Sequence, residues 1–273
     1  MSEPTQTGVS LGILTVAIGE LYIEYWSELA ESISEQTRTL GTVTIHVFTD
    51  KPQRIRAVSR DLHNLRIDIH EVPSYGWPDA SLRRYEMFRD KIDFFSDDCL
   101  MYLDSDMLLS EAITEQDLQL CVDKEVLLVR HPGYYRPKGL PGKVMFYAHN
   151  PLGLARDLIR WARFGALGDW ETRSKSSAYL PRVLRKDYVC GGTWMGERVA
   201  LAGVIQQLAD ATEADRSIGL TAKWHDESHL NRLHGETVFA TLPPSWCFVD
   251  DAPQLRGLTA IIRAVDKGTR RTR

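Results

Sequence analysis

The chain has 273 residues, with 33 Lys or Arg against 37 Asp or Glu, so its formal net charge is −4. A charge so close to neutral argues against a protein that holds nucleic acid through many phosphate contacts. Apolar residues make up 43% and charged residues 26%, as in a globular protein with a sizeable core, and no apolar run is long enough to span a membrane.

The first hundred or so residues alternate between strand-like and helix-like patterns. Short apolar, β-branched runs predict strands, and apolar residues at helical spacing predict helices. The strands are expected over residues 11–18, 43–49, 67–72 and 99–103, and the helices over residues 20–37 and 81–94. This alternation predicts an α/β fold with a mostly parallel sheet, whose first half binds a nucleotide.

The pattern loosens beyond residue 110. A strand is expected over residues 126–129 and a helix over 199–211, with a helical patch at 154–164 inside a segment rich in proline and glycine. We find no convincing linker, repeat or low-complexity segment. The second half is therefore expected to build a site on the same sheet, within a single domain.

The four cysteines are far apart in the sequence and form no CxxC pair. This pattern is typical of free thiols in a reducing compartment. We therefore expect a cytoplasmic protein in which Cys99, Cys121, Cys190 and Cys247 are all reduced.

Positive charge gathers at the C-terminal end of the sequence. Residues 267–273 contain four cations and no acid. Such a segment is usually a solvated terminus. The alternative is a flap that closes over an anionic ligand.

Two aspartates follow the apolar strand expected at residues 99–103, in the order Asp104-Ser105-Asp106. In open α/β sheets, ligands bind at the carboxyl ends of the strands. Two carboxylates separated by one residue can reach the same hard cation, which can also hold a diphosphate. Mg²⁺ or Mn²⁺ suits such oxygen ligands. The pair thus predicts a metal site, although Asp-x-Asp also occurs by chance.

A second polar group of residues is the segment Trp224-His225-Asp226-Glu227-Ser228-His229. Two histidines four residues apart share a helix face, which allows a metal-hydrolase interpretation. The zincin motif, however, has Glu directly after the first His, where this chain has Asp226. A third feature, Cys190-Gly191-Gly192-Thr193, is either a plain turn or a place where a ligand approaches the backbone closely.

These segments resemble glycosyltransferase family 6, which includes the histo-blood-group A and B transferases and the α-1,3-galactosyltransferases. The segment 224–231, WHDESHLN, carries the strongest likeness, and Asp104-Ser105-Asp106-Met107 is similar to the family's DVDM metal motif. Further matches occur in the same order along the chain, at residues 47–50, 81–87, 131–135, 177–181 and 264–267. The likeness extends from about residue 11 to the last residue.

The resemblance implies a GT-A fold, with a Rossmann-like nucleotide-binding half fused to an acceptor-binding half. The implied halves cover about residues 11–110 and 111–260 of one domain, followed by a basic lid at 261–273. It also implies transfer of GalNAc or Gal from its UDP donor to a galactoside acceptor, forming an α-1,3 bond with retention. Asp104 and Asp106 would hold the Mn²⁺ or Mg²⁺.

The resemblance further assigns roles to individual residues. Glu227 is the implied catalytic carboxylate, as a nucleophile or as a stabiliser of an oxocarbenium-like centre. The acceptor would contact His131, Trp224 and Glu227. The donor would contact Ala17, Ile18, Tyr22, Arg84, Asp104, Ser105, Asp106, Cys190, Gly191, Gly192, Asp226, Lys267 and Arg273.

Two glycines bear on the choice of donor. Gly133 and Gly192 match glycines of the family's GalNAc-using form, which favours UDP-GalNAc as the donor.

Departures from the family pattern limit what can be carried over. The chain has no match to the membrane anchor of the vertebrate enzymes, which favours a prokaryotic or phage origin. It carries an insertion of about two dozen residues between His131 and Trp170, on the presumed acceptor side. The alternative function is a non-catalytic UDP-sugar- or carbohydrate-binding protein on the same fold.

Overall fold

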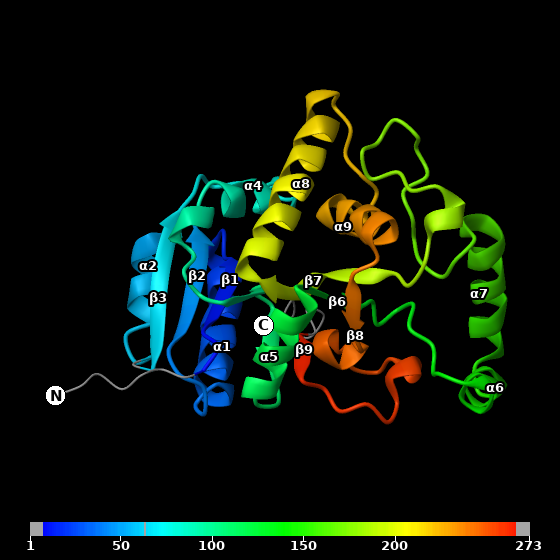
Figure 1. Ribbon diagram of the computed structural model, residues 1–273, viewed down its shortest axis with the longest axis horizontal. Coiled ribbons are helices and arrows are strands. Elements are labelled where there is room, and N and C mark those ends of the chain that lie inside the picture. The colour runs from blue at the N-terminus through cyan, green and yellow to red at the C-terminus, as the bar shows by residue number, and fades with distance from the viewer. Residues whose placement is uncertain (1–7, 63, 266–273) are drawn as a thin grey trace.

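The computed structural model describes residues 8–62 and 64–265 (Figure 1). Seven strands form a sheet in the order β3-β2-β1-β4-β7-β6-β8. They are β1 Leu11–Val16, β2 Val43–Thr49, β3 Leu65–Glu71, β4 Cys99–Leu103, β6 Val126–Arg130, β7 Val189–Glu197 and β8 Ala240–Leu242. Only β7 pairs antiparallel with its neighbours in this sheet. The predicted α/β fold with a mixed, mostly parallel sheet is therefore confirmed.

Helices cover both faces of this sheet. Successive side chains of a strand point to opposite faces, and the apolar side chains on each face pack against helices. On one face, Ile13 and Met101 pack in the same core cluster as residues of α1 Glu20–Gln36 and α5 Glu115–Lys124. On the other, Leu14 and Tyr102 pack with residues of α4 Arg84–Arg89, α8 Arg198–Ser217 and α9 His225–Thr237. The remaining helices are α2 Pro52–Val58, α3 Asp79–Leu82, α6 Leu140–Ala148 and α7 Pro151–Phe164. No helix in the described part of the chain is long and apolar enough to cross a lipid bilayer.

One local prediction from the sequence is wrong, and one of two alternatives left open for another segment is excluded. The helix expected over residues 81–94 is broken into α3, α4 and a short 3₁₀ turn at Ile92–Phe94. The break falls at Arg83, whose backbone leaves the helical region (φ −95°, ψ 2°). The Cys190-Gly191-Gly192-Thr193 segment is not a plain turn, because it lies within β7.

A second, two-stranded sheet pairs β5 Met107–Leu109 with β9 Ile262–Ala264. β5 follows the Asp104-Ser105-Asp106 segment directly, so this pairing draws the C-terminal part of the chain to that segment. The backbone N–H of Val265 donates to the carbonyl of Asp106 at 2.8 Å. The last described residue therefore lies against the predicted metal motif.

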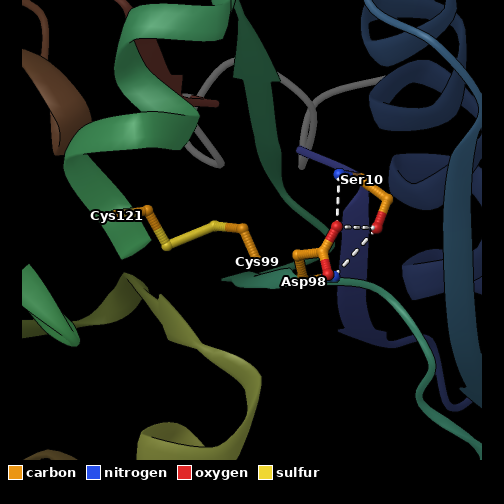
Figure 2. The surroundings of a disulfide bond; sticks show 4 residues. All are labelled: Ser10, Asp98, Cys99 and Cys121. Atoms are coloured by element: carbon orange, nitrogen blue, oxygen red, sulfur yellow. Dashed lines mark hydrogen bonds between the residues drawn. A yellow bond between two sulfur atoms is a disulfide. The ribbon is translucent and has the colours of Figure 1, made fainter. Parts of the chain in front are cut away.

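The prediction of four reduced thiols is wrong for one pair. Cys99, the first residue of β4, forms a disulfide with Cys121 of α5, and their Cα atoms are 6.4 Å apart (Figure 2). Helix α5 folds back against β4, a proximity that the sequence separation of the two residues does not reveal. Cys190 and Cys247 are free and buried. The cytoplasmic location that rested on free thiols therefore loses that support.

The disulfide lies beside a group of hydrogen bonds that join the residues just before β1 and β4. Next to Cys99, the carboxylate of Asp98 accepts hydrogen bonds from the backbone N–H and hydroxyl of Ser10, at 3.0 and 2.8 Å (Figure 2). The hydroxyl of Ser10 in turn accepts a bond from the N–H of Asp98 at 2.9 Å. These contacts align the start of β1 with the start of β4.

We expect Cys121→Ala to lower the free energy of unfolding by about 3 kcal/mol, because the bond closes a loop with a sequence separation of 22 residues. Denaturant unfolding with and without a reductant measures the change. The reductant should destabilise the native chain by a similar amount and leave the variant unaffected. A native chain that is insensitive to reductant would contradict the prediction.

Candidate functional site

The site lies where β4 ends beside the beginning of β7. Because β7 runs opposite to its neighbours, its first residues lie next to the carboxyl end of β4, where Leu103 pairs with Thr193. The N–H of Asp104 then donates to the carbonyl of Gly192 at 3.0 Å. The topology thus joins the aspartate motif to the glycine pair, two segments that are far apart in the sequence.

Helix α9 places its first turn against this glycine pair. One carboxylate oxygen of Glu227 accepts a hydrogen bond from the backbone N–H of Gly191 at 2.8 Å. A Cβ atom at Gly191 would lie 3.1 Å from the Cβ of Glu227, and one at Gly192 would lie 2.9 Å from a carboxylate oxygen of Asp104. A side chain at either glycine would therefore crowd these neighbours, because they approach the strand closely.

Asn231, one turn further along α9, fixes this helix to β7. Its side-chain amide donates to the carbonyl of Val189 at 2.8 Å, and its side-chain oxygen accepts from the N–H of Val189 at 2.8 Å. The amide also donates to the carbonyl of Glu227 at 2.9 Å. Asn231 therefore sets the position of Glu227, a role that no local sequence pattern reveals.

Arg84 occupies the centre of the site. Its Nη1 lies 3.2 Å from a carboxylate oxygen of Asp104 and 3.4 Å from one of Asp226, and it donates to the carbonyl of Gly191 at 3.3 Å. Its guanidinium lies 4.7 Å from the centre of the Tyr102 ring. Burial alone would lower the pKa of Arg84, but Asp226, Tyr102 and Asp104 together raise it well above the usual value. Arg84 is therefore a permanent buried cation.

The two acids in the first turn of α9, Asp226 and Glu227, hold their protons unusually tightly. Burial raises the pKa of Asp226 to about 6, against the opposing effect of Arg84, and the charge of Asp104 adds to the rise. Burial likewise raises the pKa of Glu227 to about 7, although the N–H of Gly191 and the hydroxyl of Tyr188 partly oppose it. Negative charge is thus crowded here, and an additional cation would relieve the crowding.

Two cavities meet at Arg84 and Asp104, which line both of them. The smaller, of about 170 Å³, lies at the ends of β1 and β4. Its lining comprises Val16, Ile18, Tyr22, Tyr75, Trp77, Ala80, Ser81, Arg84, Tyr102, Asp104, Ser105 and Asp106. The larger, of about 340 Å³, is lined by Arg84, Asp104, His131, Tyr134, Gly191, Gly192, Trp224, Asp226 and Glu227.

Most described residues predicted for the donor and acceptor thus border one continuous site, whereas Ala17 and Cys190 do not. Ala17 is fully buried, and its N–H donates to the carbonyl of Phe48 at 2.8 Å. Cys190 is buried in the core, where burial raises the pKa of its thiol well above the usual value. Lys267 and Arg273 lie outside the described residues.

Some residues of the site were not predicted from the sequence. Tyr75 and Trp77, from the segment before α3, line the smaller cavity, and Tyr134 lines the larger one. The Trp77 side chain is 75% exposed. Trp77 lies in an irregular segment without helical or strand periodicity. No sequence pattern therefore predicts that it lines a cavity, and its exposure becomes visible only in the structure.

Trp224 and His131, which the sequence analysis predicts to contact the acceptor, are held in fixed orientations. The indole N–H of Trp224 donates to a carboxylate oxygen of Asp169 at 2.8 Å. The Nδ1 of His131 accepts from the N–H of Gly133 at 3.0 Å, and burial lowers the pKa of His131 to about 4. His131 is therefore a neutral imidazole, and it can hydrogen-bond a sugar hydroxyl without carrying charge.

The donor groups at the cavity junction suit a hard divalent cation. Asp104 and Asp106 both line the smaller cavity and offer carboxylate oxygens. Within the described ranges, no group of three His, Cys, Asp or Glu side chains could hold a metal by itself. The aspartate pair therefore fits a cation that shares its other positions with a phosphate ligand and water, as Mg²⁺ commonly does.

The metal-hydrolase interpretation is not supported by the placement of its histidines. His229 is fully buried, and its Nε2 lies 3.6 Å from a carboxylate oxygen of Asp215 on α8. Of the two histidines that this interpretation requires, His229 is therefore buried in the core, away from the cavity that Glu227 lines.

Comparison with known proteins agrees with this geometry. Residues 166–267, which include β7, α8 and α9, match the family model for glycosyltransferase family 6. The chain is 27% identical to histo-blood group ABO system transferase 1 of Rattus norvegicus, over 80% of this chain and 55% of that protein. It is 27% identical to globoside alpha-1,3-N-acetylgalactosaminyltransferase 1 of Gallus gallus, over 82% and 57%.

A third relative extends the similarity over almost the whole chain. This is globoside alpha-1,3-N-acetylgalactosaminyltransferase 1 of Homo sapiens, 25% identical over 93% of this chain and 65% of that protein. The chain spans little more than half the length of the rat and chicken relatives. The family match over residues 166–267 and these relatives show that the chain is similar to glycosyltransferase family 6, and its mixed, mostly parallel sheet agrees with the α/β fold expected from that similarity.

Proposed function

We propose that the protein transfers GalNAc, or Gal, from a UDP donor to a galactoside acceptor and forms an α-1,3 bond with retention of configuration. One observation carries the proposal: Arg84, Asp104, Asp226 and Glu227 converge where two cavities meet. A transferase needs such a junction, because donor and acceptor must reach the same reacting atom from two sides. The sugar and the linkage are proposed from the similarity to the globoside alpha-1,3-N-acetylgalactosaminyltransferases of chicken and human.

The smaller cavity is the proposed donor nucleotide site. It lies at the carboxyl ends of β1 and β4, where ligands bind in open α/β sheets. Ile18 and Tyr22 would contact the uracil, with Tyr75 and Trp77 as further aromatic surfaces. Arg84, between the cavities, would face the diphosphate or the sugar and offset negative charge as the bond to UDP breaks.

Asp104 and Asp106 would hold the divalent cation. When bound, Mn²⁺ or Mg²⁺ supplies positive charge to the diphosphate that leaves with UDP. Without it, the carboxylates of Asp104 and Asp106 would repel a diphosphate. Arg84, already bound to Asp104 and Asp226, offsets only part of that repulsion.

Glu227 is the proposed catalytic carboxylate. The N–H of Gly191 and the anchoring of α9 by Asn231 hold it in place in the larger cavity. From there it would act on the anomeric carbon, either as a nucleophile or by stabilising an oxocarbenium-like charge. Asp226 would bind donor-sugar hydroxyls, and His131 and Trp224 would hold the acceptor.

The basic C-terminal segment is the proposed lid of the donor site. Its residues Lys267 and Arg273 lie outside the described structure, but Val265 directly before it is bonded to the backbone of Asp106. Val265, the last described residue, therefore lies beside the proposed metal-binding aspartates. A lid there would exclude water and limit wasteful hydrolysis of the donor.

UDP-GalNAc is the proposed donor in preference to UDP-Gal. The two glycines that match the family's GalNAc-using form do not distinguish the two donors. A Cβ at Gly192 would lie close to Asp104, and one at Gly133 would lie 3.1 Å from His131. Both are explained by packing alone. The preference for GalNAc rests instead on the family likeness and on the relatives named as N-acetylgalactosaminyltransferases.

Release of UDP tests this donor assignment directly. With Mn²⁺ and a panel of galactoside acceptors, we expect acceptor-dependent UDP release that is faster from UDP-GalNAc than from UDP-Gal. Faster release from UDP-Gal would contradict the donor preference. Binding of UDP without turnover of any donor would favour the non-catalytic alternative.

We expect Glu227→Gln to lower kcat by about 10²–10³-fold while leaving UDP affinity within a factor of about three. The amide oxygen can still accept the hydrogen bond from Gly191, so the backbone should stay in place. Turnover measured beside UDP titration calorimetry checks both halves. Glu236→Gln, an exposed residue near the other end of α9, is the matched control and should retain full activity.

We expect Asp106→Asn to raise the Mn²⁺ concentration needed for half-maximal activity by at least about tenfold, because an amide binds a hard cation more weakly than a carboxylate does. Manganese binding followed by electron paramagnetic resonance in the presence of UDP gives a readout apart from activity. Asp123→Asn, on α5, should change neither value. Full activity of the native chain after removal of metal with EDTA would contradict the proposed metal dependence.

A further inference from the structure

Helices α6 and α7, with the residues that lead into them, form an arm over residues 138–164 at the end of the molecule opposite β3 (Figure 1). Large apolar side chains cover its outer surface. They include Leu140, Val144, Met145, Leu152, Ile159 and Trp161, each at least 60% exposed. Soluble monomers rarely expose a contiguous apolar surface of this kind unless it binds something.

Helix α7 exposes large apolar side chains to solvent, whereas a helix that packs on a core buries them. Its inward stripe consists of Gly153, Asp157 and Phe164, whereas Leu152, Leu158 and Ile159 are 59–70% exposed. The buried carboxylate of Asp157 is paired with Arg136 at 2.5 and 2.6 Å and accepts from the hydroxyl of Tyr147 at 2.7 Å. A polar network thus attaches the helix to the protein and leaves its apolar side outward.

The arm is strongly basic within a chain that is acidic overall. It contains five cations, Lys138, Lys143, Arg156, Arg160 and Arg163, and a single acid, Asp157, which is already neutralised by Arg136. A symmetric dimer through this face would bring two such basic surfaces together, and like charges oppose that contact. An apolar face with arginines beside it instead suits a surface that is both apolar and anionic.

We propose that the arm binds the surface of a lipid bilayer that contains anionic lipids. Leu152, Leu158 and Ile159 would enter the boundary between headgroups and acyl chains, as the apolar face of an interfacial helix does. Arg156 and Arg163 would contact lipid phosphates. No membrane-spanning helix is required, and the proposal does not depend on the reaction that the protein catalyses.

The attachment of the arm orients the rest of the molecule on the bilayer. The guanidinium of Arg160 lies 5.2 Å from the centre of the Tyr134 ring, and Tyr134 lines the larger cavity. A bilayer bound to the arm therefore lies on the side of the molecule that carries this cavity.

Co-sedimentation with vesicles tests the proposal, using the whole chain without donor or acceptor. The native protein should bind phosphatidylcholine vesicles that contain about 30% phosphatidylglycerol, and more weakly in about 0.5 M than in about 0.1 M salt. Leu158→Glu combined with Ile159→Glu should lower the partition coefficient more than tenfold, because each buried side chain contributes about tenfold. Arg156→Gln combined with Arg163→Gln should remove most of the preference for anionic vesicles.

A matched control is Val199→Glu combined with Ile218→Glu, two exposed residues at the ends of α8. It removes similar apolar area elsewhere and should leave vesicle binding unchanged. Near-UV circular dichroism checks folding, and Leu158→Ser with Ile159→Ser replaces the glutamate pair if that variant unfolds. Absence of native binding to anionic vesicles, or an equal loss in the control, would overturn the proposal. So would a dimer, seen by sedimentation velocity, that the glutamate pair dissociates while vesicles are not bound.

Discussion

The buried contacts of Arg84 with Asp104 and Asp226 are the interaction on which the site depends. The three residues come from α4, from the end of β4 and from the start of α9, so one guanidinium joins three elements. Removal of either partner from a buried ion pair typically costs about 3–5 kcal/mol, because the remaining charge is left uncompensated. The arginine therefore fixes the geometry of the acids and also keeps their mutual repulsion tolerable.

This arrangement exists only because β7 runs against its neighbours. A parallel β7 would end, rather than begin, beside Asp104, and the glycine pair at its start would lie at the opposite edge of the sheet. Asp104 and Glu227 then approach that start so closely that a side chain at Gly191 or Gly192 would crowd them. The direction of β7, the two glycines and the positions of the acids thus depend on one another. Asn231 maintains this arrangement because it fixes α9 to β7.

The sequence predicts those parts of the fold and site that depend on local patterns. Apolar runs located β1, β2 and β4, and the strand before Asp104 placed the aspartates at a ligand-binding edge. The sequence does not predict residues whose roles depend on contacts with distant parts of the chain. Nothing near Cys99 in the sequence indicates that α5 returns Cys121 to it, and nothing near Trp77 indicates a cavity. The polar run at residues 224–229 contains Asp226 and Glu227, and the family likeness, not periodicity, predicts their roles.

The small net charge of the chain conceals two regions of opposite sign. Acids outnumber cations around Arg84, whereas the arm of α6 and α7 holds five cations and one neutralised acid. Arg136 connects the two regions: it binds Asp157 of the arm, and its Nη1 donates to the carbonyls of Gly133 and Tyr135, next to the cavity residues His131 and Tyr134. The wall of the larger cavity and the arm are therefore held by the same guanidinium, which fixes the position of one relative to the other.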